Sequence, residues 1–260
     1  MAAAQEGFRV EASLFPQGKD GPVAECEFIA GEATPDPLFA HVLDRRSRKE
    51  AFEPRAVSRD AVEGLSAYGD IYIEGDGRDA LRQIATHAWM TEMRTQDAYM
   101  ESVNLFRIGK REINANPDGI DIGGAMIEVI YAAGLFNREI AEDINDPNVA
   151  AEAERTRDII LGSPGLIVQK TPSNTRIDQM NAGRDWLRFN LAATGMGLAT
   201  RPVSQALQEY AEVQPLYEAI HRQFATNGET IQMLGLLGYA SQTPRTPRWP
   251  LETRLVNGKA

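Results

Sequence analysis

The first thirty residues alternate between apolar and polar side chains. Phe8 to Phe15 and Val23 to Ile29 show this alternation with strand-forming residues, and the turn-like segment 16–22, rich in proline and glycine, separates them. A period of two residues is typical of a half-buried strand. We therefore expect a hairpin or two linked strands at the start of the chain.

Helical spacing predominates farther along. Asp36 and Pro37 are the residue types expected at a helix N-cap and first helical position. The helices we expect lie at 38–43, 59–67, 78–106 with a break, 125–133, 149–161, 178–194 and 216–224. Alternating or short apolar stretches predict strands at 70–74, 166–168 and 230–239. This mixture, with one dominant sheet, indicates an α+β fold. The polar segment 110–122 is long enough to be a lid or an active-site loop.

Composition narrows the classes of partner. The chain has 260 residues, 43% of them hydrophobic, and a formal net charge of −10. Nucleic-acid binding requires a clustered excess of Lys and Arg, so this charge argues against a nucleic-acid partner. No apolar stretch approaches the length that a bilayer requires, so we expect no membrane partner. An anionic ligand would therefore need a few local cations, which makes basic clusters informative.

One such cluster is the run Arg45, Arg46, Ser47, Arg48 and Lys49, at the end of a predicted helix. Guanidinium groups match phosphate oxygens in geometry, and a serine hydroxyl adds a neutral donor. The same run also suits an exposed helix C-terminus, where the helix dipole favours cations. The run alone does not decide between the two.

A second basic segment lies near the carboxyl end. Residues 243–250 are punctuated by prolines and present Arg245 and Arg248 just after a predicted strand. Proline spacing holds a segment extended and lowers the entropy cost of binding an anion. A semi-rigid surface tail or a proline-rich partner motif would have the same sequence.

Gly195, Met196 and Gly197 follow the strongest predicted helix. Two glycines allow a backbone to approach a flat ring closely, and their amides could donate to its heteroatoms. The ordinary explanation is a helix stop, because glycine is the usual C-terminal cap.

The order of these motifs resembles that of the nitroreductase superfamily. The collinear set comprises the basic run before Phe52 and Pro54, the helix that ends in Gly-Met-Gly-Leu-Ala, and the strand 236–239 followed by Pro and Arg. The resemblance covers roughly 35–256. It implies an α+β homodimer with a central, mostly antiparallel sheet flanked by helices, and FMN bound at the subunit interface.

Carried onto this chain, the resemblance places Arg45, Arg46 and Ser47 near the flavin phosphate and ribityl chain, with Lys49 as a weaker candidate. Residues 194–198, which include Gly195, Met196 and Gly197, would lie against the isoalloxazine ring. Arg248, together with Arg245, would complete the phosphate site.

The implied activity is electron transfer from NAD(P)H to a nitroaromatic, a quinone or a similar acceptor. Because the flavin carries the redox chemistry, no catalytic side chain is required. The sequence accordingly shows no convincing triad, carboxylate pair or histidine-based metal motif: His41, His87 and His221 are far apart. Cys26, the only cysteine, is expected to be a small strand residue.

Two departures from the family pattern favour an alternative. Usual members carry a Ser/Asn-rich flavin contact where this chain has 65–71, Leu-Ser-Ala-Tyr-Gly-Asp-Ile. The pattern is also similar to a divergent branch with two nitroreductase-like halves in one chain, some of whose members sequester FMN beneath a lid. Flavin storage with little turnover is therefore the alternative function. An α+β interaction domain without flavin is a third, blander one.

The same resemblance suggests how the chain is organised. Residues 1–34 would be a strand pair left from a first half, and residues 35–260 the FMN-binding domain. The N-terminal sequence lacks the basic region and long apolar core of a signal peptide. We expect a cytoplasmic location by default, and export if the native chain carries an upstream signal.

Overall fold

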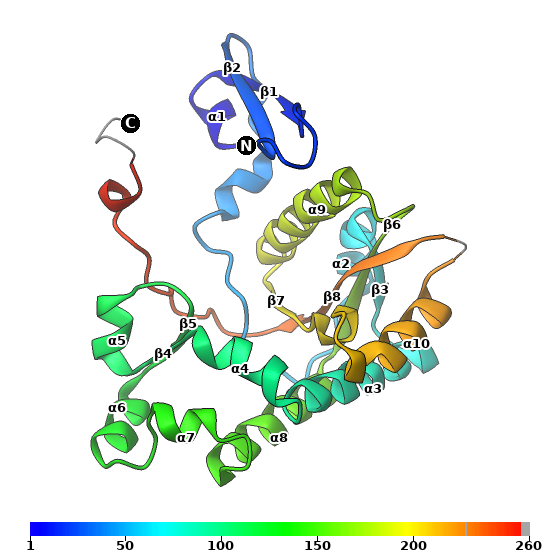
Figure 1. Cartoon of the computed structure of the whole chain (residues 1–260). Helices are drawn as coiled ribbons and strands as arrows, with labels where there is room; N and C mark the ends of the chain where they lie inside the picture. Colours follow the sequence, from blue (N-terminus) through cyan, green and yellow to red (C-terminus); the bar gives the residue numbers. More distant parts are fainter. Residues whose placement is uncertain (227, 256–260) are drawn as a thin grey trace. The chain divides into compact units, whose positions relative to one another are not determined.

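The computed structural model describes residues 1–226 and 228–255 (Figure 1). Its chain divides into two units. The first unit comprises Met1–Ile73, Pro164–Pro202 and Phe224–Ser241, and the second comprises Glu74–Ser163, Val203–Gln223 and the chain from Gln242 onward. The expected division after residue 34 stays a prediction.

The first unit contains most of the strands. Its elements are α1 (Ala2–Gln5), β1 (Phe8–Leu14), β2 (Ala24–Ala30), α2 (Arg59–Leu65), β3 (Asp70–Tyr72), β6 (Gly165–Thr171), α9 (Arg176–Gly195), β7 (Leu198–Pro202) and β8 (Thr230–Tyr239), with 3₁₀ turns at Pro37–His41 and Ser66–Tyr68. The expected helix at 38–43 is thus a shorter 3₁₀ turn. Its predicted N-cap is confirmed, because the Asp36 carboxylate accepts a 3.0 Å hydrogen bond from the Leu38 amide.

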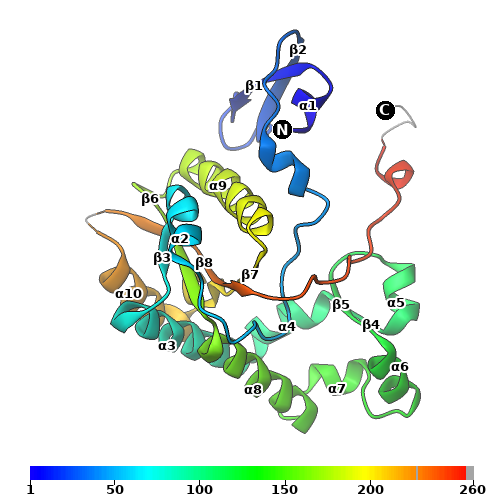
Figure 2. The ribbon, with the colours of Figure 1, turned by 180° about the vertical axis from the view of Figure 1, so that it is seen from behind.

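The hairpin at the start of the chain is confirmed. β1 and β2 pair in antiparallel register from Phe8 opposite Ala30 to Leu14 opposite Ala24 (Figure 2). Cys26 is an exposed residue of β2 opposite Ala12. Side chains alternate between the two faces of a strand pair, so Phe8, Val10 and Phe28 share one face.

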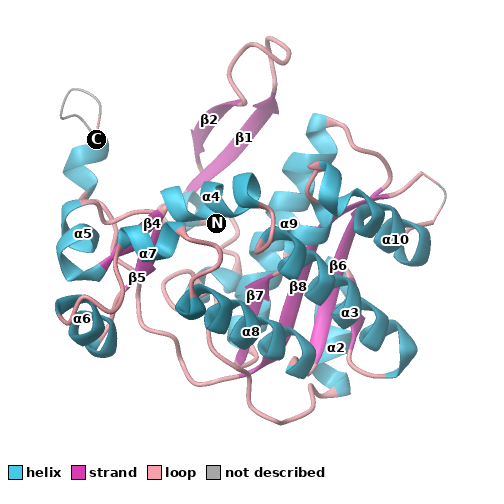
Figure 3. Ribbon diagram, turned by 60° about the horizontal axis from the view of Figure 1, so that its bottom comes forward, coloured by secondary structure: helices cyan, strands magenta, loops and turns pink. Residues whose placement is uncertain are grey.

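Within the described residues, the central sheet has four strands in the order β3-β6-β8-β7. Figure 3 shows β6, β8 and β7 side by side. Every neighbouring pair is antiparallel. The expected α+β class, with a mostly antiparallel sheet flanked by helices, is therefore confirmed. β8 has the bounds that its alternation predicts, 230–239, whereas β7 was not expected.

Helix α9 provides the core against this sheet. It begins in a reciprocal capping box: Thr175 Oγ1 accepts from the Asp178 amide, and the Asp178 carboxylate accepts from the Thr175 amide. Such a box satisfies two donors that a helix start would leave unpaired. The core cluster it shares with α2 and the sheet contains Val57, Ala61, Leu65, Ile167, Phe189, Ala192, Ala193, Leu198 and Leu237. This packing fixes where α9 ends and β7 begins.

The second unit is largely helical. Its elements are α3 (Gly75–Glu92), α4 (Gln96–Asn104), β4 (Phe106–Ile108), α5 (Gly109–Ala115), β5 (Ile120–Ile122), α6 (Ala125–Ala132), α7 (Arg138–Glu142), α8 (Pro147–Gly162) and α10 (Gln214–Phe224, its last residue at the boundary), with 3₁₀ turns at Ser204–Leu207, Ala211–Val213 and Leu251–Arg254. The expected break in the long helix lies between α3 and α4. The core cluster of the second unit consists of Met93, Tyr99, Val103, Val149 and Ala153.

The segment 110–122, expected as a lid or loop, has regular structure. Most of α5 and all of β5 lie in it, and β5 pairs in parallel with β4. Phe106, assigned from spacing to a helix, begins β4. Neither strand exceeds three residues, which is too short for periodicity to reveal. Among the helices of the described residues, none has the length and apolar character needed to cross a membrane.

Candidate functional site

The basic run lies beside β7 in the first unit. Ser47 and Thr200 form a parallel β-bridge, and the Arg48 amide donates a 2.8 Å hydrogen bond to the Thr200 carbonyl. A second hydrogen bond joins the same two segments, because Arg201 Nη1 donates to the Lys49 carbonyl at 2.8 Å. The sequence places these two segments about 150 residues apart, and the fold aligns them side by side.

The glycine turn leads directly into this strand. α9 ends at Gly195, and Gly197 adopts a left-handed φ of 73° that glycine tolerates best. The Met196 amide donates to the Ala192 and Ala193 carbonyls at 3.1 Å, and the Gly197 amide donates to the Thr194 carbonyl at 3.0 Å. Both amides therefore close the helix in this structure. That the amides of Gly195 and Gly197 donate to a ligand stays a prediction. What the turn offers is open space, since a Cβ on Gly197 would meet nothing within 4 Å.

His41 joins the glycine turn to the basic run. Its carbonyl accepts a 3.0 Å hydrogen bond from the Arg45 amide. Its imidazole lies so close to the turn that a Cβ on Gly195 would stand 2.6 Å from Nε2. Sequence spacing gave no sign of this contact, because it depends on the close approach of the 3₁₀ turn to the end of α9.

The end of β8 contacts the residues that follow the basic run. The Glu53 amide donates to the Tyr239 carbonyl at 2.8 Å, and Phe52 lies against Gly238 near the end of β8. Arg55 places its guanidinium 3.5 Å from the Tyr239 ring centroid. Hydrogen bonding with Ser58 and Arg55, together with the charge of Arg55, lowers the pKa of the Tyr239 hydroxyl, although burial opposes this shift.

The cations of the basic run have different surroundings. The Arg48 side chain is hydrogen-bonded within the protein. Its guanidinium donates to the carbonyls of Glu50, Ala51 and Ser241 at 3.1–3.4 Å. Arg46 donates from Nη1 and Nη2 to the Arg45 and Leu43 carbonyls, and its buried Nε has no hydrogen-bond partner in the described chain. Arg45 is half-buried, whereas Ser47 and Lys49 are exposed.

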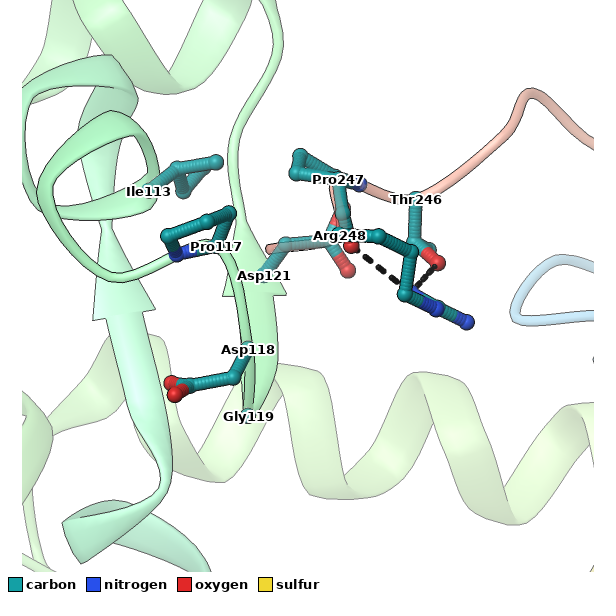
Figure 4. A pocket seen from close by; sticks show the side chains of 8 residues that line it. All are labelled: Ile113, Pro117, Asp118, Gly119, Asp121, Thr246, Pro247 and Arg248. Carbon is teal, nitrogen blue, oxygen red and sulfur yellow. Dashed lines mark hydrogen bonds between the residues drawn. The ribbon is translucent and has the colours of Figure 1, made fainter. Parts of the chain in front are cut away.

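Arg245 and Arg248 lie in the second unit, in the extended segment that follows β8. Both are exposed, and Arg248 donates to the Thr246 hydroxyl and to the Pro247 carbonyl. Thr246, Pro247 and Arg248 line a small pocket with residues of α5 and of the turn before β5 (Figure 4). That Arg245 and Arg248 complete a phosphate site with Arg45 stays a prediction.

Comparison with known proteins identifies the architecture. No protein-family model and no curated protein sequence matches the chain. Among solved structures, it is similar to the FMN-dependent nitroreductase NfnB from Mycobacterium smegmatis in complex with NADPH, at a TM-score of 0.50 and 17% identity, covering 84% of this chain and 97% of that chain. The chain has the nitroreductase-like fold. The resemblance seen in the sequence is thereby confirmed at the level of the fold.

Two further structures with this fold have comparable coverage. A nitroreductase-like family protein from Bacillus cereus gives a TM-score of 0.48 at 16% identity, covering 87% of this chain and 98% of that chain. The FMN and NADPH-dependent nitroreductase NfnB from sphigopyxis sp. strain HMH gives a TM-score of 0.49 at 14% identity, covering 85% of this chain and 98% of that chain.

The sequence patterns did not predict one polar cluster of the second unit. Asp118, in the turn between α5 and β5, accepts from Trp249 Nε1 at 2.8 Å and from Arg107 Nη2 at 2.8 Å. The Asn-Pro-Asp-Gly sequence at 116–119 signals a turn. Nothing in it, however, indicates a partner 131 residues away.

Proposed function

We propose that the protein is an FMN-binding oxidoreductase that accepts electrons from NAD(P)H and passes them to a nitroaromatic, a quinone or a similar small acceptor. The observation that carries the proposal is the Ser47–Thr200 bridge, which aligns the basic run with the strand entered from the glycine turn. Collinear sequence motifs and the nitroreductase-like fold support the same cofactor, because structures with this fold include FMN-dependent nitroreductases.

The residues of the first unit fit a phosphate-bearing flavin. Buried donors are nearly always paired in folded proteins, so the unpartnered Nε of Arg46 calls for an acceptor. Arg45, Arg46 and Ser47 would hold the phosphate and ribityl oxygens, with Lys49 adding positive charge. Gly195, Met196 and Gly197 would leave room for the ring, because the open space beside Gly197 admits a flat group.

Bound FMN would supply the hydride and electron chemistry itself. The chain's own residues would bind and orient it. The guanidinium groups match the fork geometry of phosphate oxygens, and β7 and α9 hold the basic run and the turn in fixed register. Arg248 and Arg245 would supply two further cations to the phosphate. We also propose a homodimer, since a flavin site shared between subunits is completed only by a second copy.

One observation favours the alternative, a flavin-storing protein with little turnover. The segment 65–71 occupies the place of the Ser/Asn-rich flavin contact of usual members. Its Leu65 is fully buried, and its Ser66 hydroxyl donates to the Glu63 carbonyl at 2.8 Å. The hydroxyl of Ser66 is thus engaged with its own helix.

Two measurements separate these functions. Protein reconstituted with FMN and then desalted should keep the visible flavin absorbance, and a colourless protein would refute both functions. If the yellow protein oxidises NADPH only when a quinone or nitroaromatic acceptor is added, the oxidoreductase is supported. If it remains yellow and oxidises no NADPH with any acceptor, storage is supported instead.

A further inference from the structure

The segment 242–249 lacks the usual means of being held in place. Its backbone makes no hydrogen bond to another backbone group in the described part of the chain. Pro244 and Pro247 have no amide hydrogen to donate. Contacts of its side chains must therefore hold this segment in place.

Trp249 provides a specific attachment. Its indole Nε1 donates to Asp118 Oδ2 at 2.8 Å, and the Arg254 guanidinium lies 4.8 Å from the centroid of its ring. Beside it, Pro247 faces Ile113 and Pro117 across the pocket, and the Arg248 side chain extends away from Asp118 (Figure 4). The attachment thus holds the backbone, while the Arg248 guanidinium points away from Asp118 and donates from Nη1 to Thr246 and Pro247 of its own segment.

Asp118 is itself firmly placed. Arg107 donates to Oδ1 from both Nε and Nη2, at 3.1 and 2.8 Å, which leaves Oδ2 for the indole. The next residue, Gly119, has a left-handed φ of 67°, and a Cβ there would collide with the Leu105 carbonyl. Hydrogen bonds from Trp249 and Arg107 lower the pKa of the Asp118 carboxyl, so it stays ionised at neutral pH.

We propose that Asp118 and Trp249 form a latch that holds the segment 242–249 against the turn before β5 and so positions Arg245 and Arg248 to bind a phosphate. The identity of that phosphate rests on the function proposed above. Trp249 and Asp118 are positioning residues that act through the two arginines. Opening the latch frees the segment, so each arginine would have to be ordered anew when the phosphate binds, and binding weakens.

The latch can be tested without any flavin. Trypsin can cut after Arg245 and Arg248, since neither is followed by proline, and cutting requires local release of the segment. Trp249→Phe keeps a ring for Arg254 but removes the indole donor. We expect it to speed cleavage at these two bonds about three- to tenfold, the effect of losing a typical hydrogen bond, as followed by mass spectrometry of the full chain.

Matched variants isolate the contact. Trp89→Phe is the control, because Trp89 also donates an indole hydrogen bond in the second unit, to the Ala153 carbonyl at 3.0 Å, and should leave cleavage at Arg245 and Arg248 unchanged. Asp118→Ala should match Trp249→Phe, and the double variant should be no faster than either. Asp118→Asn keeps an acceptor for the indole and should restore slow cleavage in part.

FMN titration of the same variants tests positioning. A rise in Kd that parallels the faster cleavage, again about three- to tenfold, supports the proposal. Unchanged cleavage in Trp249→Phe overturns the latch. Faster cleavage with an unchanged Kd for FMN overturns the positioning of the arginines. If the unaltered protein binds no FMN, the proposed function fails, and the cleavage rates still decide whether the latch exists.

Discussion

The Arg48 amide donates a 2.8 Å hydrogen bond to the Thr200 carbonyl, and this contact fixes the register of the basic run along β7. The Arg48 side chain continues toward the end of β8, where Nη1 donates to the Ser241 carbonyl at 3.1 Å. A residue selected as part of a cation cluster therefore connects three segments of the first unit. Its role is structural, in contrast to that proposed for Arg45 and Arg46.

Arg48→Ala should accordingly lower stability. The substitution leaves the carbonyls of Ala51 and Ser241 without this donor and costs roughly 2 kcal/mol in the free energy of unfolding, to be measured by urea denaturation. The control is Arg155→Ala, which removes an exposed helix-surface pair with Glu152 and should cost less than about 0.5 kcal/mol. Equal effects for the two variants would contradict the structural role of Arg48.

The double variant Arg45→Ala with Arg248→Ala tests the proposed phosphate site. FMN affinity should fall by several kcal/mol in total, because each charge-assisted hydrogen bond contributes about 1.5–3 kcal/mol. Fluorescence titration with FMN measures the change. Arg94→Ala with Arg222→Ala removes the same charge from exposed positions and should leave Kd nearly unchanged. An unchanged Kd in the first double variant would remove Arg45 and Arg248 from the site.

The contact between His41 and Gly195 predicts a rescue. Gly195→Ala would bring a methyl group 2.6 Å from His41 Nε2, and such overpacking costs about 1–3 kcal/mol. His41→Ala removes the imidazole, so adding Gly195→Ala to it should cost much less. A double-mutant cycle on urea unfolding free energies measures this coupling. Additive effects would show that the imidazole does not restrict the turn.

Sequence patterns predicted the longer helices and strands of this fold because each is long enough to show a clear alternation or a recognisable start and end. β8 alternates over ten residues, and α9 has both an N-terminal cap and a glycine stop. β7, by contrast, is a strand because it pairs with β8, and a five-residue segment containing Thr200 and Arg201 carries no such pattern. Tertiary pairing decided its structure.

The candidate site divides in the same way. The family resemblance led us to expect that the basic run and the glycine turn contact one flavin, which stays a prediction. The structure places the basic run beside β7, the strand that follows the glycine turn. The sequence could not separate Arg48 from Arg46, because the distinction depends on a carbonyl 193 residues away. Nor could it show that the Met196 and Gly197 amides are used to close α9.

Buried Glu92 predicts a pH dependence of stability. Only 5% of this residue is exposed, and burial raises the pKa of its carboxyl above the ordinary 4.5, although hydrogen bonds from Ser102, Gln205 and Gln208 oppose the rise. The nearby charge of Glu101 raises it further. The folded state therefore holds the proton more tightly than the unfolded state does. The stability this contributes is complete below pH 4.5 and is lost as pH rises through the folded-state pKa.

Glu92→Gln keeps a polar side chain that cannot ionise, so it should remove this loss. Relative to the unaltered protein, the variant should gain roughly 1 kcal/mol in unfolding free energy at pH 8 and little at pH 4, as measured by urea denaturation across that range. Exposed Glu139→Gln serves as the control and should shift stability by less at both pH values. A gain that is the same at pH 4 and pH 8 would contradict the raised pKa of Glu92, because stability depends on pH only where the folded and unfolded states bind the proton with different affinity.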